Sequence, residues 1–356
     1  MSNTTYLIIN FGGPRDLKEV EGFLKELLTD QEVIRTPFPS FIHRLLFTRI
    51  AKKRALKVIP EYAKIGDRSP IYEDTEKMAA TLQQYMKAPV LTFHRYLPKT
   101  HASFLSAVKQ IPEDHQIRVF PMFPQFSYVT TGSVAKFFSH NLCGQSLNQL
   151  SWIKSYATHP LYLSAFEQQI RLCLSQHNLE EEEVCLLFSA HAIPRKFVCT
   201  GDPYEKECFL SFYALKKRFP QAVCHLSYQS QFDKQEWLRP YTSDVCEEIN
   251  NWTQGRKTVV VVPLSFTSDH IETLFEIEKL YLPVIRKQGL AAIRCPALNH
   301  HPDWIQAILT IIEQEETLPN QMLVRHPTRS CCNVCMPSCC MCKKIKNIYK
   351  YRLFKE

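Results

Sequence analysis

A histidine in this sequence stands at a position suited to proton and metal chemistry. His191 directly follows the apolar run from Val184 to Phe188, so its ring is expected at the end of a buried strand. Imidazole titrates near neutrality and can accept a proton or bind a metal ion, which makes a strand-end histidine a candidate base. A lone histidine in such a place is more often a structural one, so it indicates catalysis only together with partners.

Two carboxylates are the candidate partners, and they lie in the segment from Ser265 to Glu276, which joins an apolar strand to a helix. Glu272 and Glu276 are four residues apart and would share one helical face, where like charges repel by roughly a few tenths of a kcal/mol. A cation or a shared proton nearby would relieve that repulsion. A second explanation also fits, because Asp269 precedes Glu272 by three residues, the spacing of a helix capping box.

Cysteines are concentrated near the C-terminal end. Of the 14 cysteines, six fall between Cys331 and Cys342, and a basic stretch from Lys343 to Lys355 follows them. This density is typical of a zinc site or an iron–sulfur cluster, and a thiol-rich tail without metal is the alternative. The other eight are scattered singly through strand-like and helix-like segments, as small buried side chains often are, so a disulfide framework is not expected.

The elements that must position these residues alternate between short apolar runs and helix-like stretches. Three apolar runs come before residue 150 and four after it, with a polar link around residues 146–155. Parallel strands with crossover helices give this pattern, so we predict an α/β fold of two doubly wound, Rossmann-like domains with parallel sheets. The expected strands are 6–11, 90–93, 117–123, 184–188, 223–228, 260–264 and 292–295, and the longer helices are 17–28, 76–85, 161–174 and 271–286.

This order divides the chain into domains. Residues 1–150 form the first domain, residues 151–302 form the second domain with His191 and Glu272, and residues 329–356 form a cysteine-rich basic tail. The segment 303–328 follows the last strand and is expected to pack back on the first domain. Because ligands bind open α/β sheets beyond the carboxyl ends of their strands, the polar residues that follow several of the runs should converge on one cleft.

Composition and charge narrow the class of protein. The 356 residues are 45% hydrophobic with a net charge of +8, an ordinary globular composition that could suit anionic partners. The sequence has no run of 18 apolar residues and opens without a targeting leader, so we expect a cytoplasmic protein. Residues 36–57 place apolar side chains at helical spacing beside Lys52, Lys53 and Arg54. This segment fits a pocket lip that touches the inner face of a membrane peripherally, and a core helix with a basic edge is the alternative.

Three motifs in the second half of the chain together resemble the ferrochelatase family. They are Phe188-Ser189-Ala190-His191, Gly201-Asp202-Pro203-Tyr204 and the run from Ser268 to Leu274, and the likeness extends over nearly the whole chain to about residue 312. The resemblance implies a lyase of haem biosynthesis that inserts Fe²⁺ into protoporphyrin IX, forms haem b and releases two protons. It also implies that His191 and Glu272 face each other across the porphyrin, bind iron transiently and take up the pyrrole protons, with the division of these roles open.

The same resemblance implies further site residues. Phe11, Tyr62 and Trp237 are expected in the porphyrin pocket, and the guanidinium groups of Arg54 and Arg95 are expected to engage the propionates. Solvated surface arginines are the alternative for the last two.

The resemblance also bears on the path of metal or protons and on the choice of porphyrin. Asp269 and Glu276, together with Glu272, resemble the family's route for metal or protons, which Leu280 interrupts where some relatives carry an acid. Phe11 stands where relatives often have Met or Tyr, and it cannot ligate iron. Because the Tyr form accompanies coproporphyrin III as substrate, its absence favours protoporphyrin IX.

The tail adds one expected cofactor. Cys332, Cys335 and Cys340 have the spacing of three C-terminal cysteines that hold a [2Fe–2S] cluster in some members of the family. The family's internal fourth cysteine would align near Tyr128, so the fourth ligand would be Cys143 or another tail cysteine. Fe²⁺ is expected as a substrate, and no organic cofactor is expected.

Other functions compete with iron insertion. A cobalt or nickel chelatase for another tetrapyrrole would share the fold and the strand-end histidine, but the length and the motifs disfavour it. A non-enzymatic metal-binding or nucleic-acid-binding protein would use the cysteine tail and the basic clusters, and the motifs disfavour it more. We therefore expect protoporphyrin IX and ferrous iron as partners, no nucleic acid, and either a monomer or a homodimer.

Overall fold

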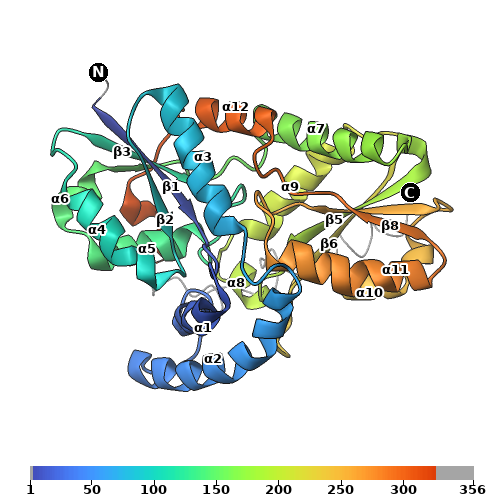
Figure 1. The fold of residues 1–356 in the computed structure, drawn as a ribbon, viewed down its shortest axis with the longest axis horizontal. Coiled ribbons are helices and arrows are strands. Elements are labelled where there is room, and N and C mark those ends of the chain that lie inside the picture. Colours follow the sequence, from blue (N-terminus) through green and yellow to red (C-terminus); the bar gives the residue numbers. More distant parts are fainter. Residues whose placement is uncertain (1–2, 326–356) are drawn as a thin grey trace, which may run out of the picture.

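The chain folds into two parallel β-sheets, each flanked by helices, that lie side by side in one elongated molecule (Figure 1). The structure, a computed structural model, describes residues 3–325. Each sheet has four strands, and every neighbouring pair of strands is parallel. The predicted α/β fold with doubly wound parallel sheets is therefore confirmed.

The first sheet has the strand order β2-β1-β3-β4. Successive residues of its central strand β1 (Thr4–Asn10) face opposite sides, so that Tyr6 and Ile8 join one hydrophobic cluster while Leu7 and Ile9 join another. Because helices cover both faces, the strand sequence is a continuous apolar run. The other elements are β2 (Val90–His94), β3 (Gln116–Pro121), β4 (Leu150–Trp152), α3 (Ile71–Met86), α4 (His101–Lys109), α5 (Thr131–Asn141) and α6 (Gly144–Gln149).

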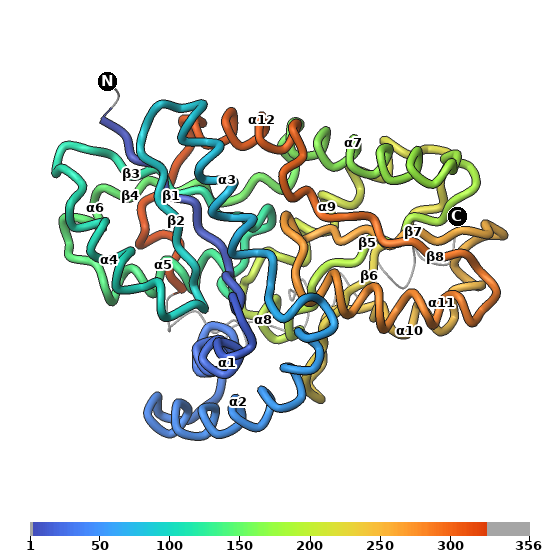
Figure 2. The backbone as a smooth tube through the Cα atoms, viewed as in Figure 1, coloured from blue at the N-terminus to red at the C-terminus, as the bar shows by residue number. Residues whose placement is uncertain are grey.

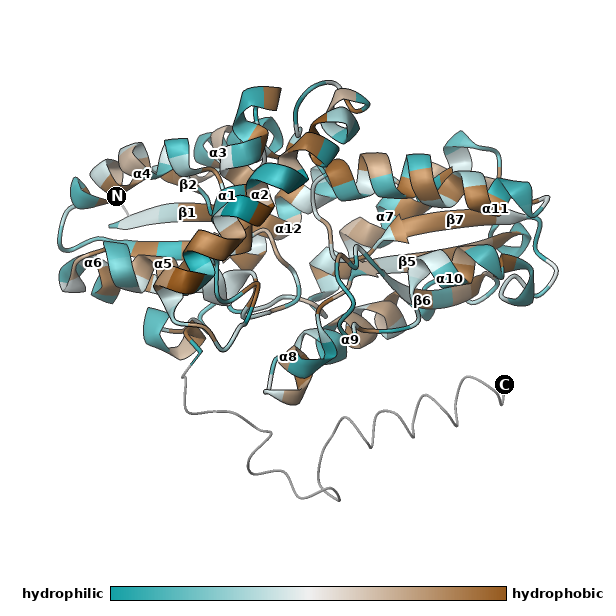
Figure 3. Ribbon diagram, turned by 90° about the horizontal axis from the view of Figure 1, so that it is seen from below, coloured by the Kyte–Doolittle hydropathy of each residue, from teal (hydrophilic) through white to brown (hydrophobic). Residues whose placement is uncertain are grey.

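The second sheet repeats this arrangement in the order β6-β5-β7-β8. Its central strands β5 (Val184–His191) and β7 (Thr258–Pro263) are buried on both faces, apart from the partly exposed His191 at the end of β5. In Figure 3, β7 is among the most hydrophobic strands. The other elements are β6 (Val223–Gln229), β8 (Ala291–Arg294), α7 (Pro160–Gln176), α8 (Arg195–Cys199), α9 (Tyr204–Lys216), α10 (Thr242–Glu247) and α11 (Leu282–Lys287).

One strand of the first sheet was not predicted. Residues 146–155 were expected to be a polar link, but Leu150–Trp152 forms β4 and pairs with β3. All three of its residues are buried, including Ser151. The strand has only three residues and lies in a polar stretch of sequence, so no apolar run marks it.

The predicted helix 271–286 is divided into two parts. Residues Glu272–Tyr281 form a π-helix, and α11 continues from Leu282. A π-helix is rare and is frequently found at functional sites, because its wider turn changes which side chains share a face. Short 3₁₀ helices elsewhere occupy Leu17–Glu19, Pro98–Thr100, Glu181–Glu183, Ile249–Asn251 and Asn320–Leu323.

Two helices project below the first sheet and form one wall of the space between the two halves. They are α1 (Val20–Thr29) and the longer α2 (Ser40–Ala63), which curves along the edge of the molecule (Figure 2). Val20, Phe23, Ala51 and Ala55 are buried between them. The predicted lip at residues 36–57 falls mostly on α2.

The last α-helix among residues 3–325, α12 (Pro302–Ile311), packs against α7 of the second half and α3 of the first. Its Trp304 is fully buried and lies close to the rings of Phe120 and Tyr162. The chain then returns to the first sheet, where Leu318 bridges Trp152.

Candidate active site

An open cleft lies between the two halves, where the strands of both sheets end. It contains about 1640 Å³ of space that is continuous with solvent. The α1 and α2 helices supply a mostly apolar wall, whereas β5, the segment after β6 and the β7–π-helix loop supply polar groups. The apolar wall includes Phe23, Leu24, Leu27, Leu28 and Val58.

His191 and Glu272 meet in this cleft. The His191 Nε2 atom lies 3.5 Å from Glu272 Oε1. The other ring nitrogen, Nδ1, donates to the Ala192 carbonyl, and the His191 amide donates to Ser265 Oγ at 2.9 Å. These bonds fix the ring so that Nε2 is the nitrogen directed at Glu272, and proton exchange or metal binding by His191 must take place at this atom.

The charges of the two side chains stabilise each other. Burial alone would lower the pKa of His191, but the Glu272 and Glu276 carboxylates more than offset it and raise that pKa to about 9. Burial alone would raise the pKa of Glu272, but His191 and His270 hold it well below its usual range. His270 Nε2 lies 3.6 Å from Glu272 Oε2. The ground state is therefore a carboxylate beside an imidazolium, a pair that can shuttle one proton.

Glu276 is the second carboxylate of the cleft. Burial and the neighbouring Glu272 raise the pKa of Glu276 to about 7, although hydrogen bonds from Ser230 and Gln229 oppose the rise. Gln229 Nε2 also donates to the main-chain oxygen of Glu272. Glu276 can thus exchange a proton near neutral pH, as a group that passes protons onward must do.

The capping-box explanation for the carboxylates is wrong. The Glu272 side chain points to the two histidines and does not cap the helix, and no side chain caps its N-terminus. Asp269 accepts from Thr273 Oγ1 at 2.7 Å and pairs with Arg294 at 2.7 Å. Asp269, expected on the metal or proton path, is not among the residues that line the cleft.

The expected pocket aromatics occupy two layers. Phe11 and Tyr62 line the cleft, and Phe11 packs edge-to-face on Tyr96. Trp237 lies behind the cleft, where it packs on Phe232 and is only 2% exposed. Trp237 therefore supports a lining residue and does not line the cleft itself.

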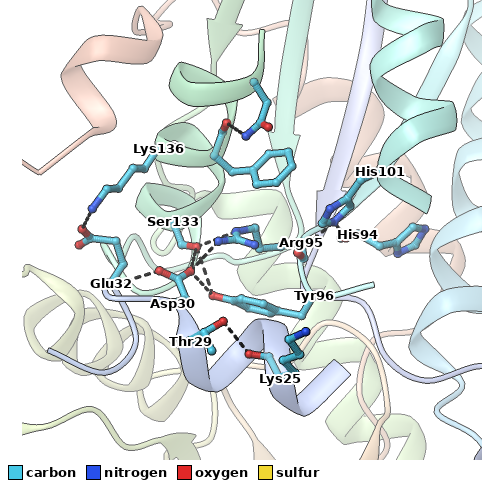
Figure 4. Close-up of polar contacts among 12 residues, drawn as sticks. Lys25, Thr29, Asp30, Glu32, His94, Arg95, Tyr96, His101, Ser133 and Lys136 are labelled. Carbon is cyan, nitrogen blue, oxygen red and sulfur yellow. Dashed lines mark hydrogen bonds and ion pairs between the residues drawn. The ribbon is translucent and has the colours of Figure 1, made fainter. Parts of the chain in front are cut away.

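The two expected propionate ligands are in different places. Arg54 lines the cleft, with its guanidinium 5.1 Å from the centre of the Phe232 ring. Arg95 lies in a separate polar pocket between α1 and α5, where it pairs with Asp30 at 2.9 Å and donates to Ser133 Oγ at 2.9 Å (Figure 4). Of the two arginines, only Arg54 faces the cleft.

Sequence reasoning assigned no role to His270, Gln229 or Ser230. His270 stands in the third motif, Gln229 ends β6 and Ser230 follows it, so their place at strand ends was the available signal. The contacts of Gln229 and Ser230 with the π-helix could not be inferred, because they join segments more than 40 residues apart. Ser230 adopts a positive φ of 68°, which directs its hydroxyl to Glu276.

The predicted cysteine site lies outside the described residues, because Cys332, Cys335 and Cys340 follow residue 325. Within residues 3–325, no group of three or more His, Cys, Asp or Glu side chains is arranged to hold a metal ion. Cys143, one candidate for the fourth cluster ligand, is exposed. None of the helices in this part of the chain combines the length and apolar character that crossing a bilayer requires.

Comparisons with known proteins agree with the motifs. The family model described as Ferrochelatase matches residues 3–316. A ferrochelatase of Chlamydia caviae is 44% identical over 322 residues, which are 90% of this chain and 99% of that protein. A ferrochelatase of Chlamydia pneumoniae is 41% identical over 325 residues, which are 91% of this chain and 97% of that protein.

The solved structures that resemble this chain are more distant. SirB from Bacillus subtilis, solved with Fe³⁺, superposes with a TM-score of 0.50 at 12% identity and covers 88% of this chain and 94% of that one. Such a likeness concerns the fold alone.

Proposed function

This chain belongs to the ferrochelatase family, and we propose that it inserts Fe²⁺ into protoporphyrin IX to form haem b, releasing two protons, in the cleft between its two halves. The observation that carries the proposal is the pair of His191 and Glu272, 3.5 Å apart at the polar end of an otherwise apolar cleft. An imidazole and a carboxylate bind ferrous iron, yet they release it more readily than four thiolates would.

The pair also suits proton removal from the pyrrole nitrogens. His191 must be neutral to accept a proton, and it becomes so by passing its own proton to a neighbouring carboxylate. Glu276, whose pKa lies at about 7, is the acceptor from which the proton can leave. In this proposal His191 removes the pyrrole protons and Glu272 stabilises the resulting imidazolium, and His191 holds iron together with Glu272 only while its Nε2 atom is unprotonated.

The lining of the cleft favours protoporphyrin IX over coproporphyrin III. Protoporphyrin carries two propionates and two vinyl groups, whereas coproporphyrin carries four propionates. Arg54 is the one Arg or Lys among the described residues that line the cleft, and the α1–α2 wall is largely apolar. A single arginine and an apolar wall match the substrate with fewer carboxylates.

The test is anaerobic incubation of the pure protein with Fe²⁺ and either porphyrin, followed by metalloporphyrin absorbance. We expect turnover with protoporphyrin IX at a higher kcat/KM than with coproporphyrin III, and loss of turnover in His191→Ala with an unchanged circular dichroism spectrum. No product with either porphyrin would sink the proposal, and full activity of His191→Ala would place the base elsewhere.

We further propose a cytoplasmic location with a peripheral membrane contact through the α2 helix. This helix exposes Phe41, Leu45 and Leu56, of which Phe41 is 74% exposed, next to several lysines and arginines. Apolar side chains with a basic flank can dip into the anionic inner face of a membrane. In co-sedimentation with phosphatidylglycerol vesicles, Phe41→Ser/Leu45→Ser should bind several-fold less than wild type. Leu172→Ser, an exposed leucine on α7, is the matched control, and equal binding by all three proteins would rule out this contact.

We also propose a [2Fe–2S] cluster on Cys332, Cys335 and Cys340, from their spacing in the sequence alone, with Cys143 or another tail cysteine as the fourth ligand. Protein purified without oxygen should contain equimolar iron and acid-labile sulfide, and a chain ending at Thr328 should contain neither. Absence of both from the full chain would contradict the proposal.

A further inference from the structure

The loop between β7 and the π-helix places Glu272, and side chains from other parts of the molecule hold this loop. Ser268 stands four residues before Glu272 and is 3% exposed. Its hydroxyl donates to the Asp74 carboxylate. One residue earlier, Thr267 Oγ1 donates to the Met122 carbonyl at 2.9 Å, and the Thr267 carbonyl accepts from the Asn299 amide at 2.8 Å.

Asp74 belongs to α3 in the first half, whereas Ser268 belongs to the second half. The Asp74 side chain is 9% exposed, and both of its oxygens are used. Oδ2 accepts from Ser268, and Oδ1 lies 2.8 Å from Nδ1 of His300, which precedes α12. A carboxylate is buried at little cost only when it is paired and hydrogen-bonded, so His300 and Ser268 together stabilise Asp74 in this position.

The same turn of α3 also reaches the opposite wall of the cleft. Thr75, next to Asp74, accepts from Asn10 Nδ2 at 2.9 Å. The Asn10 side chain in turn accepts from the amide of Phe11, a cleft residue, at 2.8 Å. One helical turn therefore links the end of β1, which lines the cleft, to the loop that carries Glu272.

We infer that Asp74 and His300 are positioning residues for iron insertion. Through Ser268 they hold the loop that carries Glu272 in a fixed position relative to the end of β1. The inference rests on the proposed function, because it takes His191 and Glu272 as the reacting pair. His300 does not line the cleft, and Asp74 reaches the cleft only through Ser268. A small displacement of a reacting group can cost up to about a hundredfold in rate, so a contact that holds this loop has a measurable effect on turnover.

A merely structural role makes different predictions. If the cluster only stabilised the fold, its loss would lower the melting temperature, while kcat of the folded protein would stay the same. If it positions Glu272, kcat falls while KM for the porphyrin, set mainly by the apolar wall and Arg54, changes little.

The experiment measures kcat and KM anaerobically with the full chain, at a temperature well below the melting point of every variant. We expect Asp74→Ala and Ser268→Ala each to lower kcat about tenfold, with KM for protoporphyrin IX within twofold of wild type. The double variant should be no slower than the slower single variant, because both changes break one contact. Asp74→Asn keeps an acceptor for Ser268 and should recover most of the rate.

Two further variants complete the design. His300→Asn, which removes the outer partner, should also lower kcat. Glu73→Gln is the matched control, because Glu73 is an exposed carboxylate of the same helix that pairs with Arg68. If Asp74→Ala, Ser268→Ala and His300→Asn all retain kcat within twofold of wild type, the positioning role is excluded. If wild type itself has no turnover, the proposed function fails and this inference falls with it. Ser268→Ala and His300→Asn are small changes and keep the test decisive if Asp74→Ala does not fold.

Discussion

Replacing Glu272 by Gln should lower the pKa of His191 by about two pKa units. The two side chains lie 3.5 Å apart, and unit charges at that distance attract each other by about 5 kcal/mol at an effective dielectric constant near 20. That energy corresponds to roughly 3 to 4 pKa units. The pKa of His191 rises only from 6.5 to about 9, because burial acts in the opposite direction.

Two features of the site explain why we expect a fall of about two pKa units and not the roughly 3 to 4 units of the full attraction. The His191 side chain is 34% exposed, so water screens part of the attraction. Glu276 also remains in the variant, and its carboxylate still raises the pKa of His191. The pKa of His191 should therefore fall from about 9 to about 7, and His191 should be largely neutral in the variant at pH 8.

The measurement is a titration of ¹⁵N-histidine-labelled protein by NMR, with His191 identified by the signal that is missing from His191→Gln. Glu278→Gln is the matched control, because Glu278 lies on the same π-helix but pairs with Arg294. A fall of less than half a pKa unit in Glu272→Gln, or an equal fall in the control, would refute the assignment of Glu272 as the main counter-charge.

Other variants test separate parts of the structure. Arg54→Ala should raise KM for protoporphyrin IX about tenfold, a loss of about 1.4 kcal/mol, with an unchanged unfolding free energy. Arg95→Ala should leave KM within twofold and instead lower the unfolding free energy by about 3 kcal/mol, measured in urea, because it leaves the 7%-exposed Asp30 without its cation. Trp304→Ala should cost about 3 to 5 kcal/mol in the same assay, because a fully buried ring is lost; a cost below about 1 kcal/mol would contradict the packing described for α12. As pH rises from 5 to 8, the unfolding free energy of wild type should fall relative to that of Glu276→Gln, by at most about 3 kcal/mol. The raised pKa of Glu276 stabilises the folded state only while the carboxyl is protonated, and Gln cannot lose a proton. Urea unfolding at several pH values checks this last prediction, and a constant difference between the two proteins would contradict it.

The buried strands could be predicted because a strand covered on both faces is an apolar run whatever its partners are. β4 could not, because it has only three residues and Ser151 is polar. His191 was placed correctly because the end of a parallel strand is a fixed location in such a fold. Side-chain direction was harder to predict, since the different surroundings of Arg54 and Arg95 depend on how α1 and α5 pack.

The carboxylates in and after the third motif show the same limit. Asp269, Glu272 and Glu276 look alike in sequence, but Arg294 holds the first while the other two face the cleft. Arg294 lies 25 residues away on β8, so no local pattern could separate the three carboxylates. The division of the helix into a π-helical and an α-helical part likewise has no signature in the spacing of its apolar residues.

The position of α12 has a consequence for how this protein unfolds. Tyr6, Phe120 and Met78 of the first half share one hydrophobic cluster with Phe166, Val260 and Leu186 of the second, and Trp304 belongs to it. Neither sheet keeps a complete core if the other is removed, so the two halves should unfold in one calorimetric transition. Either half produced as a separate fragment would expose this cluster to water and aggregate. Because α12 packs against α7 of the second half and α3 of the first, the two sheets should not swing apart as independent rigid bodies.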